Sequence, residues 1–407
     1  MPIKISFTGD IMSLMPQNKA SRRRNNTYDY DRVFCFVKRL FNDADYVVGN
    51  LETPIAGEEL GYTKEPTVFN TPCEFASSAF CAGINCFTLA NNHILDRGVE
   101  GLNNTVKNLD IIGADHTGAY TSLIESQEVL IKEIKGVRIA FLSYTYGTNS
   151  EWQNNVLTEE TDYCVDLFRK QDAFLGISER PVIKLIKRLI KKLLPQFLRE
   201  KIRPIVSEDG VGTIEPAQGD MLYIHRLREK IKKAKNNSDY VIMCMHSGGQ
   251  YNSEIGPYTR DLAHRLIDYG CDLVIGNHPH CVLEYERYRD QLIIYSLGNF
   301  CFTPNWGFYY NGVYADYSLV LNTYFEKKQN SVKLSKVTVT PIKCVREKDG
   351  NSVVYPISLL YGSLPTKKRQ KMISDVYCVL ERFLRSGKVG TMNVLNNEID
   401  VTCYLNQ

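Results

Sequence analysis

Acidic, amide and imidazole side chains occur in six short clusters between Gly9 and Phe300. The clusters are Gly9-Asp10, Gly49-Asn50-Leu51-Glu52, Asn91-Asn92-His93 with Asp96, His246, Gly276-Asn277-His278-Pro279-His280, and Ser296-Leu297-Gly298-Asn299-Phe300. They contain four of the seven histidines. Carboxylates mixed with imidazoles and an amide are typical ligands of divalent ions such as Mn, Fe or Zn. This pattern predicts an enzyme rather than a scaffold.

The clusters together supply enough ligands for two divalent ions that share one carboxylate. The predicted ligands are Asp10, Glu52, Asn92, His246, His278 and His280. Such a pair of ions polarises a phosphoryl or carbonyl oxygen and activates a water molecule. We expect His93 to protonate the leaving group and the nearby carboxylate of Asp96 to orient its imidazole.

Several clusters also have a purely structural interpretation when each is taken alone. Asp10 is then typical of a helix cap or an Asx-turn, and His246 of a hydrogen-bonded core histidine. His278 and His280 fit this interpretation less well. They flank a rigid proline directly after a strand, and alternate residues of an extended segment point to the same side. The metal-site hypothesis therefore depends on the clusters acting together.

Strands and helices alternate along the chain. The expected strands of the first block are residues 3–8, 46–49, 86–90 and 137–144, and its expected helices are residues 30–42, 72–82 and 98–109. A second block has expected strands at 240–245, 272–275 and 291–295, with helices ending near 235 and spanning 258–269. Longer alternating runs at 317–324 and 332–342 indicate antiparallel strands, and a helix follows at 367–384. This order predicts an α/β fold whose site collects at the carboxyl ends of strands.

The overall composition excludes some classes of function. A net charge of +3 over 407 residues argues against general nucleic-acid binding. We find no charged leader followed by an apolar run and no apolar stretch long enough to span a membrane, so a cytoplasmic location is expected. The 12 cysteines lack the pair spacing of zinc sites. We interpret them as free thiols in a reducing compartment rather than as disulfides.

A basic amphipathic helix is expected at residues 181–203, within an insertion of about residues 150–215. Its lysines and arginines outnumber its acids, and its apolar residues recur at helical spacing. One interpretation is peripheral attachment to anionic lipid at the inner face of the membrane. The other is a lid helix packed on the core, with its lysines in water.

The clusters, in this order, resemble the CapA family of capsule and poly-γ-glutamate biosynthesis proteins, which belongs to the calcineurin-like metallophosphoesterase superfamily. The resemblance covers residues 4–345 and is carried by residues 50–52, 90–98, 276–280 and 295–300. It implies a four-layer α/β/β/α sandwich, formed by residues 1–345 with a helical, basic insertion and followed by a helical extension at 346–407. It also implies that Glu52 is the bridging carboxylate, and that Asp10, Asn92 and the three late histidines are ligands.

The resemblance leaves two functions open. The first is a phosphoesterase-like hydrolase with two divalent ions, acting on an anionic polymer or a lipid-linked glycan precursor. The second is a non-catalytic accessory subunit of a polymer synthase. Met12 stands where the superfamily usually has a histidine ligand, and Gln250 where the family usually has an acid, and both departures favour the second. The residues expected to bind substrate are Asn50, Gln250, Tyr251, Ser296 and Asn299.

Overall fold

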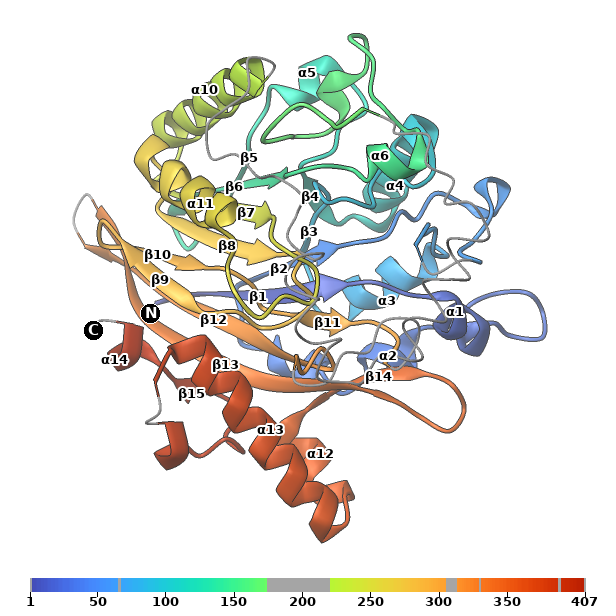
Figure 1. The fold of residues 1–407 in the computed structure, drawn as a ribbon, viewed down its shortest axis with the longest axis vertical. Helices are drawn as coiled ribbons and strands as arrows, with labels where there is room; N and C mark the ends of the chain where they lie inside the picture. Colours follow the sequence, from blue (N-terminus) through green and yellow to red (C-terminus); the bar gives the residue numbers. More distant parts are fainter. Residues whose placement is uncertain are drawn as a thin grey trace, which may run out of the picture.

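Two β-sheets face each other and carry helices on their outer sides (Figure 1). The computed structural model describes residues 2–64, 67–173, 220–304, 313–328, 331–386 and 389–405. The expected basic helix at 181–203 lies outside the described residues, as does the expected insertion beyond residue 173.

The larger sheet has nine strands of mixed direction. Its order is β14–β13–β12–β1–β2–β3–β4, with β11 paired to β1 and β15 paired to β13. Strands β1 to β4 run parallel, and β12 is antiparallel to β1. The bounds are β1 Ile3–Ile11, β2 Tyr46–Leu51, β3 Cys86–Thr88, β4 Asp115–Thr117, β11 Asn299–Cys301, β12 Tyr317–Lys328, β13 Ser331–Arg346, β14 Ser352–Pro356 and β15 Ile399–Asp400.

The smaller sheet has six strands in the order β5–β6–β7–β8–β10–β9. Strands β6, β7, β8 and β10 run parallel, and the edge strands β5 and β9 are antiparallel to their neighbours. The bounds are β5 Leu130–Ile134, β6 Val137–Thr145, β7 Tyr240–His246, β8 Leu273–Asn277, β9 Tyr285–Tyr288 and β10 Gln291–Ile294.

Single strands contribute alternate side chains to two different core layers. In β2, Val48 packs between the sheets, whereas Val47 packs under the helices of the larger sheet. In β7, Ile242 packs between the sheets, whereas Val241 packs under the helices of the smaller sheet. Successive side chains of a strand point to opposite faces, so both sheets bury both faces. The expected four-layer α/β/β/α sandwich is confirmed.

The helices cover the two outer faces and one end of the sandwich. Helices α3 and α4 pack on the larger sheet, and α10 and α11 pack on the smaller one. The bounds are α1 Met15–Ser21, α2 Asp31–Phe34, α3 Glu74–Cys81, α4 Gly98–Ile112, α5 Leu123–Ser126, α6 Ser150–Gln153, α10 Met221–Asn237, α11 Pro257–Tyr269, α12 Ile357–Ser363, α13 Thr366–Leu384 and α14 Thr402–Leu405.

The helix expected over residues 30–42 is wrong as a single element. The segment forms the short helix α2 and, after a turn, the 3-10 helix η1 at Lys38–Leu40. Val33, Phe34, Val37 and Phe41 are all buried against the sheet. The spacing of apolar residues therefore predicts correctly which side chains are buried, although the backbone forms two short helices, α2 and η1, rather than one.

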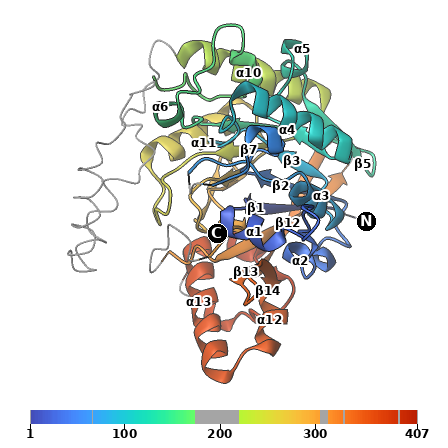
Figure 2. The same ribbon diagram turned by 90° about the vertical axis from the view of Figure 1, so that its right-hand side faces the viewer.

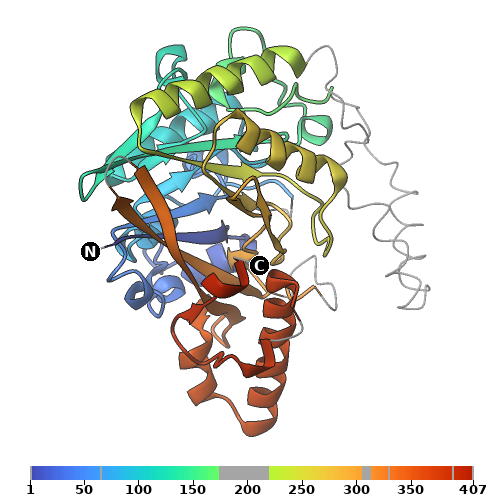
Figure 3. The ribbon, with the colours of Figure 1, turned by 90° about the vertical axis from the view of Figure 1, so that its left-hand side faces the viewer.

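The region after residue 345 shares its core with the sandwich. Strands β14 and β15 both pair with β13, and Met372 and Phe383 of α13 belong to the cluster between the sheets. Figures 2 and 3 show α12 and α13, in red, at the lower end of the molecule. The division into a domain of residues 1–345 and a C-terminal extension stays a prediction.

Strands β1 and β11 approach so closely that only glycine fits at residue 9. A Cβ atom at Gly9 would lie 1.8 Å from the carbonyl oxygen of Gly298. We expect Gly9→Ala to lower the free energy of unfolding by about 3 kcal/mol, because the two backbones must separate. Urea unfolding measures this change, with Gly362→Ala as the matched control, since a Cβ atom at Gly362 meets nothing within 4 Å. Equal stability of the two variants would contradict the prediction.

Candidate metal centre

Strand ends from both sheets bring four predicted ligands to one place. Asp10 is the last residue but one of β1, and Glu52 directly follows β2. His246 ends β7, and the residue after β8 is His278. The arrowheads of these strands point to the same side in Figure 1. Since the carboxyl ends of parallel strands meet at one edge of each sheet, the two sheets together form the candidate centre.

One set of donor atoms converges around His246. We call it the four-ligand group, and its members are Glu52, Asn92, His246 and His278. His246 Nε2 lies 3.6 Å from Glu52 Oε1, 2.9 Å from Asn92 Oδ1 and 3.1 Å from His278 Nδ1. A carboxylate, an amide oxygen and two imidazoles fit a divalent ion of the Mn, Fe or Zn type.

A second set, the three-ligand group, consists of Asp10, Glu52 and His280. Their donor atoms all lie within 4.8 Å of one another. His280 Nδ1 is 3.2 Å from Asp10 Oδ2, and His280 Nε2 is 3.7 Å from Glu52 Oε1. Glu52 belongs to both groups, which suits a shared carboxylate. The structure therefore brings all six predicted ligands together, and their role in binding metal stays a prediction.

The surroundings of Glu52 fit an ion better than they fit an empty core. Its side chain is 0% exposed, and among the described residues neither carboxylate oxygen has a hydrogen-bond partner. Burial raises the pKa of Glu52 well above 4.5, and the negative charge of Asp10 raises it further. A buried acid without hydrogen-bond partners is costly, and a divalent cation would remove that cost.

Burial favours the neutral form of the two histidines of the four-ligand group, which is the form that binds metals. Burial lowers the pKa of His246 well below 6.5, and the neighbouring His278 and His280 lower it further. Burial also lowers the pKa of His278, followed by the effect of His280. Neutral imidazoles offer a lone pair without first losing a proton.

We expect metal binding to release a proton from Glu52, so the apparent affinity for Mn²⁺ rises with pH. Because the pKa of Glu52 is raised above 4.5, the proton competes with metal up to that raised pKa and less beyond it. Protonation of His246 and His278 competes only below 6.5. Calorimetric titration at about pH 6, 7 and 8, in buffers of different ionisation enthalpy, measures both quantities. A constant affinity without proton release would contradict this prediction.

The loop after β8 holds its two histidines in an uncommon backbone conformation. The φ angles are 104° at His278 and 57° at His280. Side chains other than glycine rarely adopt positive φ, and such strain concentrates at functional sites. The chain accepts this strain at the two residues whose imidazoles enter the two ligand groups.

His93 and Asp96 form a pair beside the ligand groups. His93 Nδ1 lies 2.7 Å from Asp96 Oδ2, and the same oxygen accepts from the backbone N–H of Phe69 at 2.5 Å. The Phe69 ring stacks on His93 with centroids 4.0 Å apart. Because Nδ1 of His93 is hydrogen-bonded to the Asp96 carboxylate, Nε2 is the ring nitrogen available for proton transfer. The sequence does not indicate a role for Phe69, because Phe69 is distant from His93 and Asp96 in the chain and the fold brings them into contact.

The five residues expected to bind substrate lie at different depths. Asn50, Ser296 and Asn299 are at most 2% exposed. Asn50 Nδ2 donates to Asp10 Oδ1 at 2.8 Å, and Asn299 Oδ1 lies 3.0 Å from His280 Nδ1, so both lie behind ligands. Gln250 is exposed, and the half-buried Tyr251 has its ring centroid 5.2 Å from that of His280. Substrate binding by these residues stays a prediction.

Met12 lies in the core rather than in the centre. It is 5% exposed and belongs to the cluster beneath the helices of the larger sheet. The three-ligand group therefore gains no ligand from residue 12.

We expect two unequal Mn²⁺ affinities that differ at least about 10-fold, with the four-ligand group binding more tightly. In a calorimetric titration His280→Ala should lose only the weaker step, and two equal steps in the wild type would contradict the prediction.

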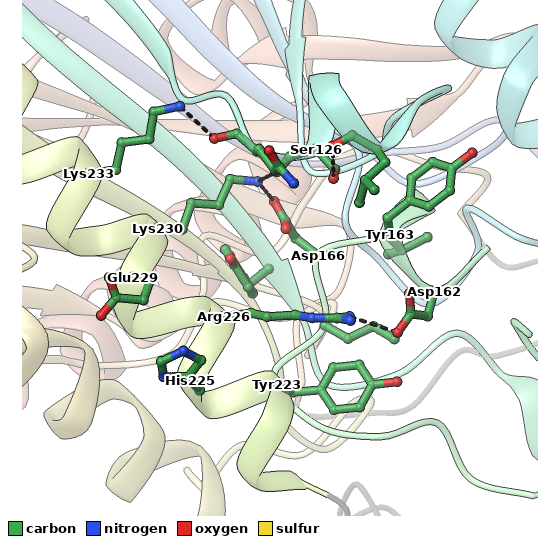
Figure 4. A pocket seen from close by; sticks show the side chains of 15 residues that line it. Ser126, Asp162, Tyr163, Asp166, Tyr223, His225, Arg226, Glu229, Lys230 and Lys233 are labelled. Carbon is green, nitrogen blue, oxygen red and sulfur yellow. Dashed lines mark hydrogen bonds and ion pairs between the residues drawn. The ribbon is translucent and has the colours of Figure 1, made fainter. Parts of the chain in front are cut away.

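A separate pocket lies between α5, α10 and the 3-10 helix η3 at Asp162–Cys164 (Figure 4). Its volume is about 510 Å³, and its described lining contains none of the predicted site residues. Lys230 Nζ pairs with Asp166 Oδ2 at 2.7 Å, and Arg226 Nη1 pairs with Asp162 Oδ2 at 2.7 Å. These cations are already matched by acids, so the pocket offers no comparable centre for chemistry.

The family of this chain is established by its sequence. A sequence model of the bacterial capsule synthesis protein family PGA_cap matches residues 4–304. The chain belongs to this family, and the resemblance to CapA proteins is confirmed.

Two curated relatives and one solved structure illustrate the similarity. The capsule biosynthesis protein CapA of Bacillus anthracis is 25% identical over 307 residues, 75% of this chain and 61% of that protein. The PGA biosynthesis protein CapA of Bacillus subtilis (strain 168) is 25% identical over 348 residues, 84% of this chain and 74% of that protein. The calcineurin-like phosphoesterase YfkN from Bacillus subtilis has a TM-score of 0.42 at 13% identity, covering 93% of this chain and 99% of that one. The chain thus spans less than two thirds of the Bacillus anthracis relative.

Among the described helices, none combines the length and apolarity needed to cross a membrane.

Proposed function

We propose that this chain is a metal-dependent hydrolase of the phosphoesterase type that acts in the synthesis of a capsule, another surface polysaccharide or poly-γ-glutamate. The observation that carries the proposal is the position of Glu52. It is buried without hydrogen-bond partners among the described residues and lies between two groups of ligand atoms. Membership of the capsule synthesis family supports the setting of the reaction.

Each group of residues has a distinct role in this function. Two bound ions of Mn, Fe or Zn would supply Lewis acidity and an activated water molecule. Glu52 would be shared by both ions, while Asp10 and His280 would hold one and Asn92, His246 and His278 the other. His93 would give a proton from Nε2 to the leaving oxygen, with Asp96 holding the opposite nitrogen at 2.7 Å.

Metal content and hydrolysis test the proposal together. Plasma mass spectrometry would count the ions in the wild type, in Asp10→Asn and in His278→Ala, alongside Mn²⁺-dependent hydrolysis of a generic phosphodiester. His225→Ala is the matched control, because His225 is exposed and lines the separate pocket. We expect about two ions per wild-type chain, fewer ions and no turnover in each of the two site variants, and unchanged ion content and turnover in the control. Turnover that survives in both site variants would reject the hydrolase.

A non-catalytic accessory subunit of a polymer synthase is the second candidate function. The observation that favours it is the incomplete three-ligand group, because Met12 is buried in the core. A folded variant without metal that still supports polymer formation in cells would establish it. A variant that loses metal and polymer together would favour the hydrolase.

The proposed partners are an anionic polymer or a lipid-linked glycan precursor, and the subunits of a polymer synthase. A cytoplasmic location stays a prediction, as does peripheral membrane contact through residues 181–203, which lie outside the described residues. Co-sedimentation with anionic liposomes, with and without this segment, tests the contact. Equal binding of both forms would reject it.

A further inference from the structure

The segment after β6 lies directly against the four-ligand group. The Tyr146 N–H donates to the carbonyl oxygen of His246 at 3.1 Å, and the Tyr146 ring centroid lies 4.8 Å from that of His278. Three residues further on, Asn149 Oδ1 accepts from Asn92 Nδ2 at 3.1 Å. The segment therefore contacts three predicted ligands: the backbone of His246, the ring of His278 and the side-chain amide of Asn92.

The contact between Asn149 and Asn92 bears on which atom of the Asn92 amide faces the four-ligand group. Asn92 is fully buried, and its Oδ1 lies 2.9 Å from His246 Nε2. Rotating the Asn92 amide by half a turn would place its Nδ2, which has no free lone pair, at the ligand position. The same rotation would set Asn92 Oδ1 against Asn149 Oδ1, oxygen facing oxygen. With its own Oδ1 facing Asn92 Nδ2, Asn149 therefore favours the orientation in which Asn92 presents its oxygen.

Asn149 is itself held in place by its neighbours. Its φ angle of 56° is in the left-handed region, where asparagine is enriched. Its carbonyl oxygen accepts from the backbone N–H of Gln153 at 3.1 Å. On either side, Thr148 Oγ1 accepts from Gln171 Nε2, and Ser150 Oγ donates to the carbonyl oxygen of Asp172 at 2.7 Å. The backbone that carries the Asn149 side chain is thus held on both sides.

We propose that Asn149 is a positioning residue that holds the Asn92 oxygen toward the four-ligand group. Asn149 acts through Asn92, as the outer partners of metal ligands commonly do, and such partners change metal affinity by roughly 10- to 100-fold. The proposal deepens the metal-dependent function above and rests on it.

Titration of the metal-free full chain with Co²⁺ tests this role, because the visible absorption of Co²⁺ reports both its affinity and its ligand geometry. We expect Asn149→Ala to bind Co²⁺ roughly 10- to 100-fold more weakly and with an altered spectrum. Asn149→Asp keeps an oxygen acceptor and should restore the spectrum and the affinity. Asn154→Ala is the matched control, since Asn154 is exposed and has a similar φ angle of 53°, so alanine strains the backbone equally at both positions.

Two results would overturn the inference while the hydrolase proposal survives. One is an Asn149→Ala chain with the affinity and spectrum of the wild type. The other is an equal loss in Asn154→Ala, which would trace the effect to the backbone of the segment. A wild-type chain that binds no Co²⁺, Mn²⁺ or Zn²⁺ would overturn both proposals.

Discussion

Glu52→Gln is expected to remove both metal ions and to lower kcat by at least about 1,000-fold, equal to about 4 kcal/mol of activation free energy. Glu52 Oε1 lies 3.6 Å from His246 Nε2 in one ligand group and 3.7 Å from His280 Nε2 in the other. Since Glu52 belongs to both groups, its loss affects two ions, whereas the loss of a histidine affects one. A neutral amide also lacks the charge that balances two divalent cations.

The same substitution should not destabilise the metal-free fold. The pKa of Glu52 is raised above 4.5 by burial and by Asp10, so folding favours its protonated form. The folded state therefore loses stability as pH rises from 4.5 toward the raised pKa. Glu52→Gln has no such penalty, and its thermal midpoint without metal should equal or exceed that of the wild type at about pH 8.

Plasma mass spectrometry, phosphodiester hydrolysis and thermal unfolding of the metal-free chain measure these three effects. Glu229→Gln is the matched control, because Glu229 is exposed and lies outside both ligand groups. A Glu52→Gln chain that keeps two ions would show that the carboxylate is not shared. A large fall in the metal-free thermal midpoint would show that Glu52 stabilises the fold.

The positions of several predicted ligands could be recognised in the sequence because they lie at or directly after the end of an apolar strand. Asp10 lies next to the end of β1, His246 ends β7 and His278 follows β8, and parallel strands of an α/β fold gather such residues at one edge. The strand and helix order could be predicted for the same reason, because burial sets the periodicity of the sequence. Periodicity alone did not show that residues 30–42 break into α2 and η1.

Contacts between distant loops could not be predicted from the sequence. Asn149 and Phe69 touch Asn92 and His93 only because the fold places their loops together. Neither residue directly follows a strand, and neither lies in one of the six clusters of acidic, amide and imidazole residues. The burial of Asn50, Ser296 and Asn299 could not be predicted either. The sequence of a polar residue near a site does not show whether its side chain faces the substrate or supports a ligand. The sequence thus indicated the candidate ligands but not the residues that contact and support them.

His93→Asn is expected to lower kcat by roughly 100- to 10,000-fold while both metal ions stay bound. His93 lies beside the ligand groups, and the carboxylate of Asp96 holds its Nδ1 at 2.7 Å. Stacking with Phe69 at 4.0 Å fixes the plane of the ring. The imidazole is therefore oriented for proton transfer from Nε2 rather than for metal binding.

The choice of leaving group separates a proton donor from a merely structural residue. A 4-nitrophenyl leaving group needs little protonation, whereas an alkyl leaving group needs much more, so the variant should lose far less rate with the first. Plasma mass spectrometry confirms that the ions remain, and His116→Asn, which replaces a histidine paired with Asp110 outside the site, should behave as the wild type. An equal loss of rate with both leaving groups would rule out His93 as the acid. Only the rate contribution of a proton donor depends on the basicity of the leaving oxygen.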